Sequence, residues 1–206
     1  MPHVDIRIAL WNANGISEKR VEIEFYLNYY KIDLLLLSET HCTDLTHTFI
    51  RGYTFIGVNH PSGRARGGSG ILIKHNIHYE PAKNICAPNM QMTSIRLITN
   101  TNKITVAAIY CPPNTAIDRT NYTVAFNQLC PPFIVGGDYN SKHTWFGSRL
   151  STRRGRELLS CIQGNGFDIL STGSPTFWSS NPAVVPDLLD FFIYSGVAHN
   201  AIRISE

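Results

Sequence analysis

Four consecutive leucines limit what this chain can fold into. They occupy residues 34–37, at the end of the apolar segment Ile32–Leu37, which only Asp33 interrupts. The segment has the length of a β-strand and falls far short of the ~20 residues that a bilayer span requires. A strand that is apolar at every position belongs in a sheet that is covered on both faces. We therefore expect a layered protein in which this strand is buried between other elements.

Strand-like and helix-like segments alternate along the rest of the chain. Apolar and polar residues alternate in Val4–Trp11, which predicts a half-buried strand. Ser17 can cap a helix that follows it. The other predicted strands are Ile71–Lys74, Met90–Ile98, Lys103–Tyr110, Phe133–Val135 and Leu188–Tyr194, and the other predicted helices are Arg119–Leu129 and Arg154–Gln163. Interleaved elements of this kind predict an α/β fold with helices outside packed sheets. No linker divides the chain, so we expect a single domain over residues 1–206.

Composition and missing motifs exclude several classes of protein. Of the 206 residues, 43% are hydrophobic and only 16% are charged, which argues against disorder and against a coiled coil. The N-terminus shows no secretory signal, so we expect an intracellular protein without a membrane span. The five cysteines are widely spaced, which predicts reduced thiols rather than a zinc site. The glycines at 67–70 match no nucleotide-binding pattern, and no serine-hydrolase motif occurs.

Polar residues that could bind a metal or take part in catalysis follow two of the predicted strands. Glu39 follows the leucines, and Asp138 and Asn140 follow Phe133–Val135. A spacing of two puts Asp138 and Asn140 on one face of an extended segment. Carboxylate and amide oxygens suit a hard divalent cation such as Mg²⁺, and strand ends that converge on one rim commonly form active sites. A solvated carboxylate at Glu39 and an Asx turn at Asp138 remain open as alternatives.

Three further candidates stand in or beside predicted strands. Asp190 has apolar neighbours on both sides, and a buried carboxylate must be hydrogen-bonded or paired. It is therefore either a site residue or half of a structural ion pair. Asn12 and Tyr110 also lie at strand ends, where a turn asparagine and a core tyrosine are the default interpretations.

A basic stretch follows Asn140 directly. Between Ser141 and Arg156 the chain carries five Lys and Arg residues and no Asp or Glu, which exceeds the net charge of +3 of the whole chain. Aromatic residues are interleaved with these charges, an arrangement that suits phosphate contacts combined with stacking or wedge insertion. A solvated start of a helix is the alternative. Arg64 and Arg66, in the glycine-containing loop, could add a second phosphate-facing edge.

Five short motifs occur in one order along the chain. They are Trp11-Asn12-Ala13-Asn14-Gly15, Ser38-Glu39-Thr40-His41, Ile109-Tyr110-Cys111-Pro112-Pro113, Gly137-Asp138-Tyr139-Asn140 and Leu188-Leu189-Asp190-Phe191-Phe192. In this order they resemble the endonuclease/exonuclease/phosphatase superfamily, and most closely the apurinic-type endonuclease domain of jockey-like non-LTR retrotransposons. The segments Ser141–Ser148 and Pro186–Asp190 are the most similar to that group. The resemblance covers nearly the whole chain.

The resemblance implies a four-layer α/β/β/α sandwich of the deoxyribonuclease-like kind. It also implies a divalent-metal-dependent endonuclease that nicks double-stranded DNA and leaves a 3′-hydroxyl for priming reverse transcription. Mg²⁺ is the expected cofactor, with Mn²⁺ as the alternative ion. A reverse transcriptase domain in a parent polyprotein is the expected partner, and the nucleus is the expected site of action because the substrate is there.

The resemblance also implies roles for individual residues. Glu39 would be the main metal ligand, and Asn12 would assist at the metal or at the scissile phosphate. Tyr110 would contact the phosphate or the leaving oxygen. The expected catalytic set is Asn12, Glu39, Tyr110, Asp138, Asn140 and Asp190. In it, Asp138 would position or activate the water, Asn140 would orient the phosphate and Asp190 would support the site through hydrogen bonds. Thr176 falls where the family has a DNA-contacting threonine. Together with the basic and aromatic residues described above, the expected DNA-contacting set is Arg64, Arg66, Lys142, His143, Trp145, Arg149, Arg153, Arg154 and Thr176.

The sequence departs from the family pattern near its end. The family pattern closes with Ser-Asp-His and an apolar strand, and the printed sequence stops at Ser205-Glu206 without them. We therefore expect a sheet that lacks its last strand and a nicking rate lowered by about 10² to 10⁴. Two alternatives stay open at this point. One is a phosphatase of the same fold that acts on inositol phosphates or lipid headgroups, and the other is a catalytically impaired DNA-binding remnant.

Overall fold

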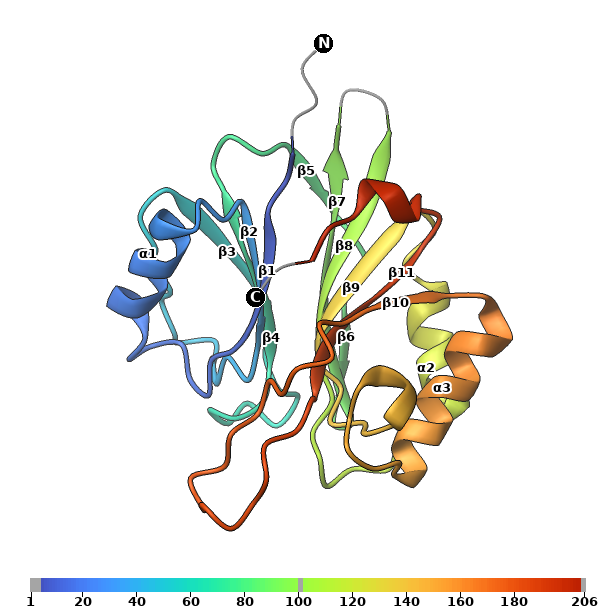
Figure 1. Cartoon of the computed structure of the whole chain (residues 1–206). Coiled ribbons are helices and arrows are strands. Elements are labelled where there is room, and N and C mark those ends of the chain that lie inside the picture. Colours follow the sequence, from blue (N-terminus) through green and yellow to red (C-terminus); the bar gives the residue numbers. More distant parts are fainter. Residues whose placement is uncertain (1–4, 100–101, 205–206) are drawn as a thin grey trace.

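The computed structural model describes residues 5–99 and 102–204, which form two β-sheets packed face to face (Figure 1). The first sheet has four strands in the order β1-β2-β4-β3. The second has seven, in the order β10-β11-β9-β8-β7-β5, with β6 also paired to β7. The strands are β1 Ile8–Asn12, β2 Leu34–Ser38, β3 Tyr53–Val58, β4 Ser69–Lys74, β5 Tyr79–Pro81, β6 Ile85–Ala87, β7 Met90–Ile98, β8 Lys103–Tyr110, β9 Phe133–Asp138, β10 Asp168–Leu170 and β11 Asp190–Ser195.

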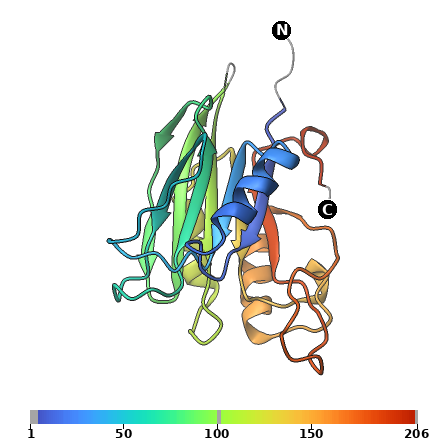
Figure 2. The same ribbon diagram turned by 90° about the vertical axis from the view of Figure 1, so that its left-hand side faces the viewer.

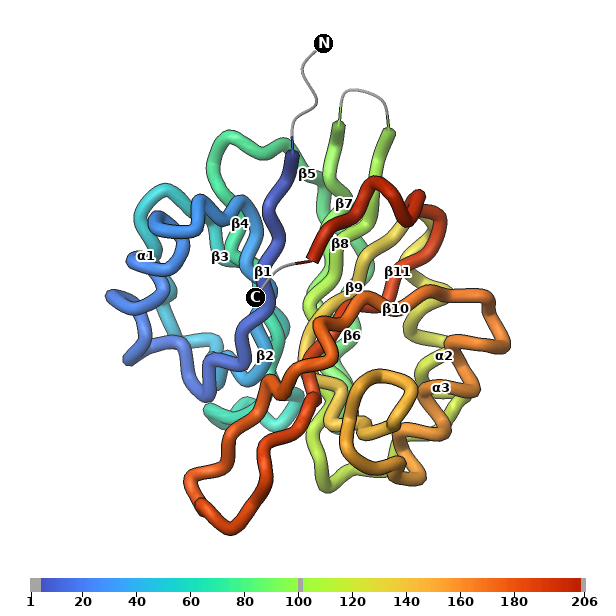
Figure 3. The backbone as a smooth tube through the Cα atoms, in the orientation of Figure 1, coloured from blue at the N-terminus to red at the C-terminus, as the bar shows by residue number. Residues whose placement is uncertain are grey.

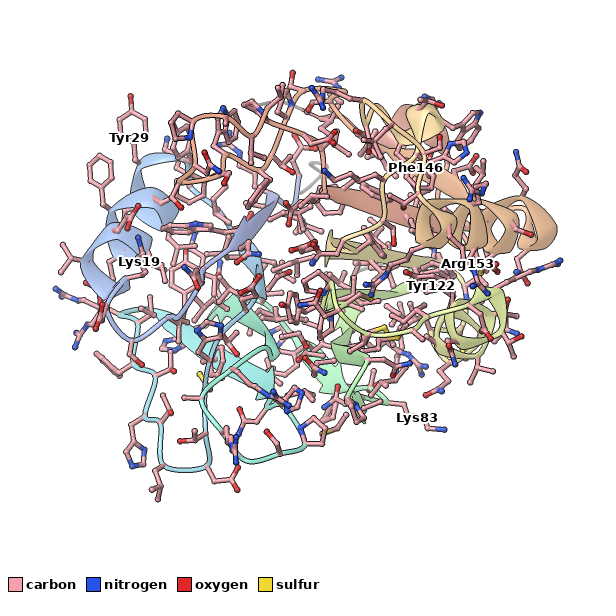
Figure 4. The ribbon with its side chains drawn as sticks, turned by 90° about the horizontal axis from the view of Figure 1, so that it is seen from below. Lys19, Tyr29, Lys83, Tyr122, Phe146 and Arg153 are labelled. Carbon is pink, nitrogen blue, oxygen red and sulfur yellow. The ribbon has the colours of Figure 1, made fainter. Side chains whose placement is uncertain are left out.

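Helices cover the outer face of each sheet, which completes a four-layer α/β/β/α sandwich (Figures 1 and 2). Helix α1 (Arg20–Tyr29) packs on the first sheet, and α2 (Arg119–Asn127) and α3 (Arg153–Asn165) pack on the second. In Figure 4, a view from below, Tyr29 on α1 and Arg153 on α3 stand on opposite sides of the two sheets. The layered α/β architecture expected from the sequence is confirmed.

The leucine strand β2 shows why two covered faces were expected. All four of its leucines are fully buried. Leu35 and Leu37 pack with the apolar face of α1, whereas Leu34 and Leu36 pack between the two sheets. Because successive side chains of a strand point to opposite faces, a strand in this position must be apolar throughout. By contrast, β1 lies at the edge of its sheet among the described strands, and all five of its residues are partly exposed.

The strand pairing gathers the polar residues at one edge of the sandwich. Strands β1 and β2 are parallel, and Asn12 stands beside Ser38 at their carboxyl ends. Strands β8 and β9 are also parallel, and Tyr110 stands beside Asp138. The long connection between β10 and β11 runs out from the same end of the molecule (Figure 3). This edge therefore holds the candidate site.

Some predicted element boundaries were wrong. Ser17 does not cap α1, which starts at Arg20 with Lys19 in the cap position and no side-chain cap bond. The last strand begins at Asp190 rather than at Leu188, because the residues before it form the base of a hairpin. Strand β9 continues through Gly136, where a Cβ atom would lie 2.5 Å from Leu10 and 2.7 Å from Phe192.

Three cysteines, Cys42, Cys111 and Cys161, are buried as small apolar groups, and Cys86 and Cys130 are exposed. Among the helices of the described residues, none is both long and apolar enough to cross a bilayer.

Candidate active site

One asparagine side chain joins carboxylates from the two sheets. Asn12, the last residue of β1, donates from Nδ2 to Glu39 Oε1 at 2.8 Å and to Asp138 Oδ2 at 3.1 Å. Its Oδ1 accepts a hydrogen bond from the backbone N–H of Asn14 at 3.1 Å. The amide is thus fixed at both ends, and it holds the two carboxylates on either side of a single donor group.

Glu39 has an unusual backbone conformation that neighbouring segments stabilise. It lies just past β2 with a φ of 53°, in the left-handed region that side chains other than glycine rarely adopt. Its carbonyl accepts from Gly15 N at 2.8 Å, and the N–H of His41 donates to Gly67 O at 2.9 Å. Such conformations persist where the surroundings over-determine them, commonly at functional sites. The strained backbone at Glu39, stabilised by these hydrogen bonds, therefore sets the direction of its carboxylate.

Asp138 is fixed by hydrogen bonds from several directions. It ends β9, and its side chain is buried. Ser38 Oγ accepts from Asp138 N at 3.0 Å and donates to Ile109 O at 3.0 Å, which ties the two sheets together beneath the site. Asn140 donates from its backbone N–H to Asp138 Oδ1 at 2.7 Å and from Nδ2 to Oδ2 at 3.0 Å. Asp138 is therefore a rigidly held acceptor.

Asp190 completes a group of three acidic residues. It lies opposite Asp138 in the pairing of β11 with β9. Thr176 Oγ1 donates to Asp190 Oδ2 at 2.8 Å and accepts from the N–H groups of Leu189 and Asp190 at 3.0 Å each. The other carboxylate oxygen, Oδ1, is buried and has no hydrogen-bond partner in the described part of the chain. A buried oxygen of this kind is a vacant acceptor position.

Burial and mutual repulsion dominate the electrostatics of this group. Burial, together with the nearby charges of Asp190 and Glu39, holds the pKa of Asp138 well above its usual range. Burial and the charge of Glu39 raise the pKa of Asp190 to about 6, although the Thr176 hydrogen bond opposes this. Burial and the charges of Glu39 and Asp138 also raise the pKa of Tyr110, so its hydroxyl remains a proton donor at neutral pH. Neither Asp138 nor Asp190 forms an ion pair within residues 5–99 and 102–204.

This donor set fits a hard divalent cation. The site offers carboxylate oxygens with excess negative charge and one unsatisfied buried oxygen. Among the described residues, no group of three or more His, Cys, Asp or Glu side chains could hold a metal ion by itself. Mg²⁺ does not need such a cage, because it is usually bound by one or two carboxylates together with water and phosphate oxygens. Asn12 turns its nitrogen toward the carboxylates, so direct contact of its oxygen with an ion would require rotation of the amide.

The basic stretch after Asn140 divides into inward and outward residues. Arg154 points inward, where Nη1 donates to Pro112 O at 2.6 Å. Lys142 Nζ lies 2.8 Å from Asp187 Oδ2. His143 is also partly engaged, since Nδ1 accepts from the N–H of Trp145 at 3.1 Å. The exposed basic and aromatic residues of the stretch are Trp145, Arg149, Arg153 and Arg156.

The loop before β4 brings a second set of cations to the site. Arg64 and Arg66 are exposed, and the two glycines that follow them pack against Thr40 and His41 through backbone hydrogen bonds. Gly67 has a φ of 52°, and a Cβ atom there would lie 2.8 Å from Gln91 Oε1 and 3.3 Å from the Tyr110 ring. A side chain at this position would displace Gln91, which holds the loop through Gly68 N, so the small residue keeps the basic loop close to Glu39.

Sequence reasoning missed several residues that support the site. Ser38 and Gln91 are buried polar residues within strands. Gln91 accepts from Gly68 N at 3.1 Å and so holds the glycine loop. His41 Nε2 lies 3.5 Å from Glu39 Oε2. For Gln91 the sequence offers only a polar residue inside an apolar strand, and for Ser38 its place at the start of the Ser38-Glu39-Thr40-His41 motif; neither signal identifies the hydrogen-bond partners.

Comparison with known proteins identifies the family to which this chain belongs. The model of the endonuclease/exonuclease/phosphatase family matches residues 9–205. The chain belongs to this family. The resemblance drawn from the five motifs is thereby confirmed.

Relatives of this chain include RNA-directed DNA polymerases of mobile elements. The chain is 37% identical over 196 residues to the RNA-directed DNA polymerase from mobile element jockey of Drosophila melanogaster, covering 95% of this chain and 21% of the relative. It is 34% identical over 193 residues to the probable RNA-directed DNA polymerase from transposon X-element of the same species, covering 93% of this chain and 21% of the relative. The chain therefore spans about a fifth of the length of these relatives.

Solved structures agree on the fold of the family. The endonuclease domain of TRAS1, a telomere-specific non-LTR retrotransposon, matches with a TM-score of 0.74 and 19% identity, covering 93% of this chain and 85% of that one. The AP endonuclease LMAP from Leishmania major matches with a TM-score of 0.72 and 15% identity, covering 92% and 79%. At these identities the two structures establish the deoxyribonuclease-like fold.

Proposed function

We propose that this chain is a metal-dependent endonuclease domain that hydrolyses one phosphodiester in double-stranded DNA. The observation that carries the proposal is the Asn12 amide, which holds Glu39 and Asp138 from different sheets at 2.8 and 3.1 Å. Asp190 adds a third carboxylate beside them. Family membership and the retrotransposon relatives support a nuclease rather than an unrelated hydrolase.

Glu39 is the proposed ligand of the divalent cation, and Asn12 holds it in place. The cation, Mg²⁺ with Mn²⁺ as the alternative, would polarise the scissile phosphate and neutralise developing charge when bound. Asp138 orients the attacking water and accepts its proton, for which a raised carboxylate pKa is suited. The protonated hydroxyl of Tyr110 donates a hydrogen bond to the phosphate or to the leaving oxygen.

Two further residues hold these groups in position. Asn140 binds both oxygens of Asp138 and also donates to Cys111 O at 3.2 Å. Asn140 thereby holds the Asp138 carboxylate in place, and it would lie beside the phosphate of a bound substrate. Asp190, held by Thr176, lies opposite Asp138 in the pairing of β11 with β9. Such fixed hydrogen-bond donors and acceptors lower the reorganisation needed during reaction.

The proposed DNA contacts come from two exposed basic segments on either side of the site. One is the loop with Arg64 and Arg66, and the other carries Arg149, Arg153 and Trp145. The side chain of Trp145 is 56% exposed, which leaves its ring free to contact a nucleotide. Neutralisation of several phosphates gives affinity for a long polyanion with little dependence on sequence. Because a lipid or inositol headgroup is small, this spread of cations favours DNA as the substrate.

The retrotransposon relatives suggest the wider role. The chain spans 21% of the jockey polyprotein, which is named as an RNA-directed DNA polymerase. We infer that this domain nicks target DNA in the nucleus, and that the resulting 3′-hydroxyl primes a reverse transcriptase domain of the same polyprotein.

The decisive experiment offers the purified protein two substrates in the presence of Mg²⁺. Supercoiled plasmid tests nicking, and extension of the product by a DNA polymerase tests for a 3′-hydroxyl. Inositol polyphosphates test phosphate release. We expect nicked, extendable plasmid and no phosphate release. Phosphate release with intact plasmid would establish a phosphatase instead. Salt-sensitive DNA binding in EDTA without nicking in any divalent cation would establish a binding remnant.

A further inference from the structure

An ion pair with a buried carboxylate lies just outside the candidate site. Lys142 follows Asn140 by two residues, and its Nζ is 2.8 Å from Asp187 Oδ2. The side chain of Asp187 is 2% exposed and that of Lys142 is 29% exposed. Asp187 Oδ1 accepts from the backbone N–H groups of Arg149 and Leu188 at 3.0 Å each. Asp187 is thus bound on one side to the segment that leads into α3.

The backbone of Asp187 forms the base of a hairpin. Its carbonyl accepts from the N–H groups of Thr176 and Phe177 at 3.0 Å each, and its own N–H donates to Phe177 O at 3.1 Å. Thr176 in turn binds Asp190 Oδ2 at 2.8 Å. An unbroken series of polar contacts therefore runs from Lys142 through Asp187 and Thr176 to the acidic site.

Lys142 is anchored at its other end as well. Its carbonyl accepts from Thr152 N at 2.9 Å and from Thr152 Oγ1 at 3.2 Å, and Thr152 is the residue that caps α3. Lys142 therefore links the start of α3, through its carbonyl, to the hairpin base, through its side chain.

We propose that Lys142 is a positioning residue, which fixes the hairpin base through Asp187 and so holds Thr176 against Asp190. The inference rests on the proposed function for its effect on catalysis. It assigns Lys142 a role different from the phosphate contact suggested by its place in a basic stretch.

The environment of Asp187 favours positioning over phosphate binding. Burial alone would raise the pKa of Asp187, but the nearby Lys142 ammonium and hydrogen bonds from two backbone N–H groups hold that pKa below its usual value. If Lys142 turned outward to a phosphate, it would leave a buried carboxylate without its cation, which is strongly unfavourable. Exposed neighbours such as Arg153 form no ion pair with a buried carboxylate among the described residues, so they can turn toward a phosphate without this cost.

The test compares Lys142→Met, Lys142→Arg, Asp187→Asn and the double variant Lys142→Met/Asp187→Asn. The control pair is Lys103→Met and Glu80→Gln, because Lys103 and Glu80 form an exposed ion pair of 2.8 Å at the opposite end of β8. Three readouts are used: amide hydrogen exchange at residues 176, 177, 189 and 190, the kcat and KM of nicking, and the salt dependence of DNA binding in EDTA.

Lys142→Met is expected to speed amide exchange at the hairpin base by about tenfold or more. It should also lower kcat by about ten- to a hundredfold with little change in KM. The slope of log affinity against log salt should stay at the wild-type value. Lys142→Arg should restore exchange and kcat, Asp187→Asn should add little loss to Lys142→Met, and the control variants should behave as wild type.

A salt slope reduced by about 0.9, with unchanged exchange and kcat, would make Lys142 a phosphate contact and overturn the inference. Unchanged values in all three measurements would overturn it too. If the wild-type protein does not nick DNA at all, the proposed function fails, but hydrogen exchange still decides the role of Lys142.

Discussion

Asp138 and Asp190 lie directly opposite each other on the neighbouring strands β9 and β11. Each raises the cost of ionising the site, because both carboxylates are buried and Glu39 adds a third negative charge nearby. Such an arrangement destabilises the ionised carboxylates in the absence of a cation, and with them the fold. It is typical of a site that is adapted to bind a cation and not to maximise stability.

Burial of Asp190, reinforced by the charge of Glu39, predicts how stability depends on pH. The pKa of Asp190 is raised to about 6 in the folded protein, whereas an unfolded aspartate titrates near ~3.9. Between these values the folded state binds more protons than the unfolded state, so the free energy of unfolding falls as pH rises through this window. Asp190→Asn removes this loss and should stabilise the metal-free protein by roughly 1–3 kcal/mol at about pH 7.5.

Urea unfolding in EDTA measures the effect, with substitution of the exposed Asp5 by Asn as the matched control. A variant Asp190→Asn that is less stable than the wild type across the whole pH range would show that Asp190 carries a structural role and no electrostatic penalty.

Asn12 should be required as a donor. Asn12→Asp replaces its amide by a further carboxylate between Glu39 and Asp138, so repulsion replaces two hydrogen bonds. The nicking rate should fall by about 10² to 10³. The same exchange at Asn127, an exposed residue at the end of α2, serves as control and should leave the rate unchanged. Equal rates for the two variants would mean that the Asn12 amide does not organise the site.

The glycine loop offers a test with a control inside the same loop. Gly68 and Gly63 both have positive φ, 86° and 69°, so alanine strains the backbone at either position. At Gly68 the new Cβ would also lie 2.5 Å from Thr40 Oγ1, whereas at Gly63 nothing lies within 4 Å. Gly68→Ala should therefore cost about 1–3 kcal/mol more stability than Gly63→Ala, and should reduce nicking. Thermal unfolding of the two variants checks this, and equal losses would contradict a close approach of the loop to Thr40.

Substitution of two adjacent arginines, Arg153 and Arg154, should have opposite effects on DNA binding and on stability. Arg153→Gln removes an exposed charge and should lower the salt slope of DNA binding by about 0.9 with little effect on stability. Arg154→Gln removes hydrogen bonds to Pro112 O and to Tyr122 Oη. It should cost about 1–3 kcal/mol of stability and leave the slope unchanged. A filter-binding salt titration and urea unfolding separate the two effects, and the reverse pattern would refute the inward orientation of Arg154.

Elements defined by local pattern could be predicted from the sequence. The boundaries expected for Met90–Ile98 and Lys103–Tyr110 are those of β7 and β8, because alternation within each strand and polar residues between them are local signals. The leucine run also predicted its covered position. The start of α1 was missed because Ser17 is a good cap in isolation, but here it lies in a turn closed by the hydrogen bond from Lys19 N to Ile16 O, and the helix begins only after that turn.

Partners across the fold could not be predicted. Arg153 and Arg154 are the same residue type at adjacent positions, and only Arg154 meets Pro112, more than forty residues earlier in the chain. Lys142 pairs with Asp187 in the same way. Local sequence reports charge but not direction, since direction depends on what the tertiary structure places nearby. Strand ends nevertheless predicted the candidate site residues, because parallel pairing brings them to one edge.

The most direct test of the whole account is the nicking rate of Glu39→Gln in Mg²⁺, with Glu80→Gln as the control. Both substitutions remove one carboxylate charge, but Glu80 forms an exposed ion pair with Lys103, remote from the site. We predict that Glu39→Gln lowers the rate by about 10² to 10⁴ without loss of fold, and that Glu80→Gln nicks like the wild type. Equal nicking by both variants would show that the activity does not depend on Glu39 and would contradict the account.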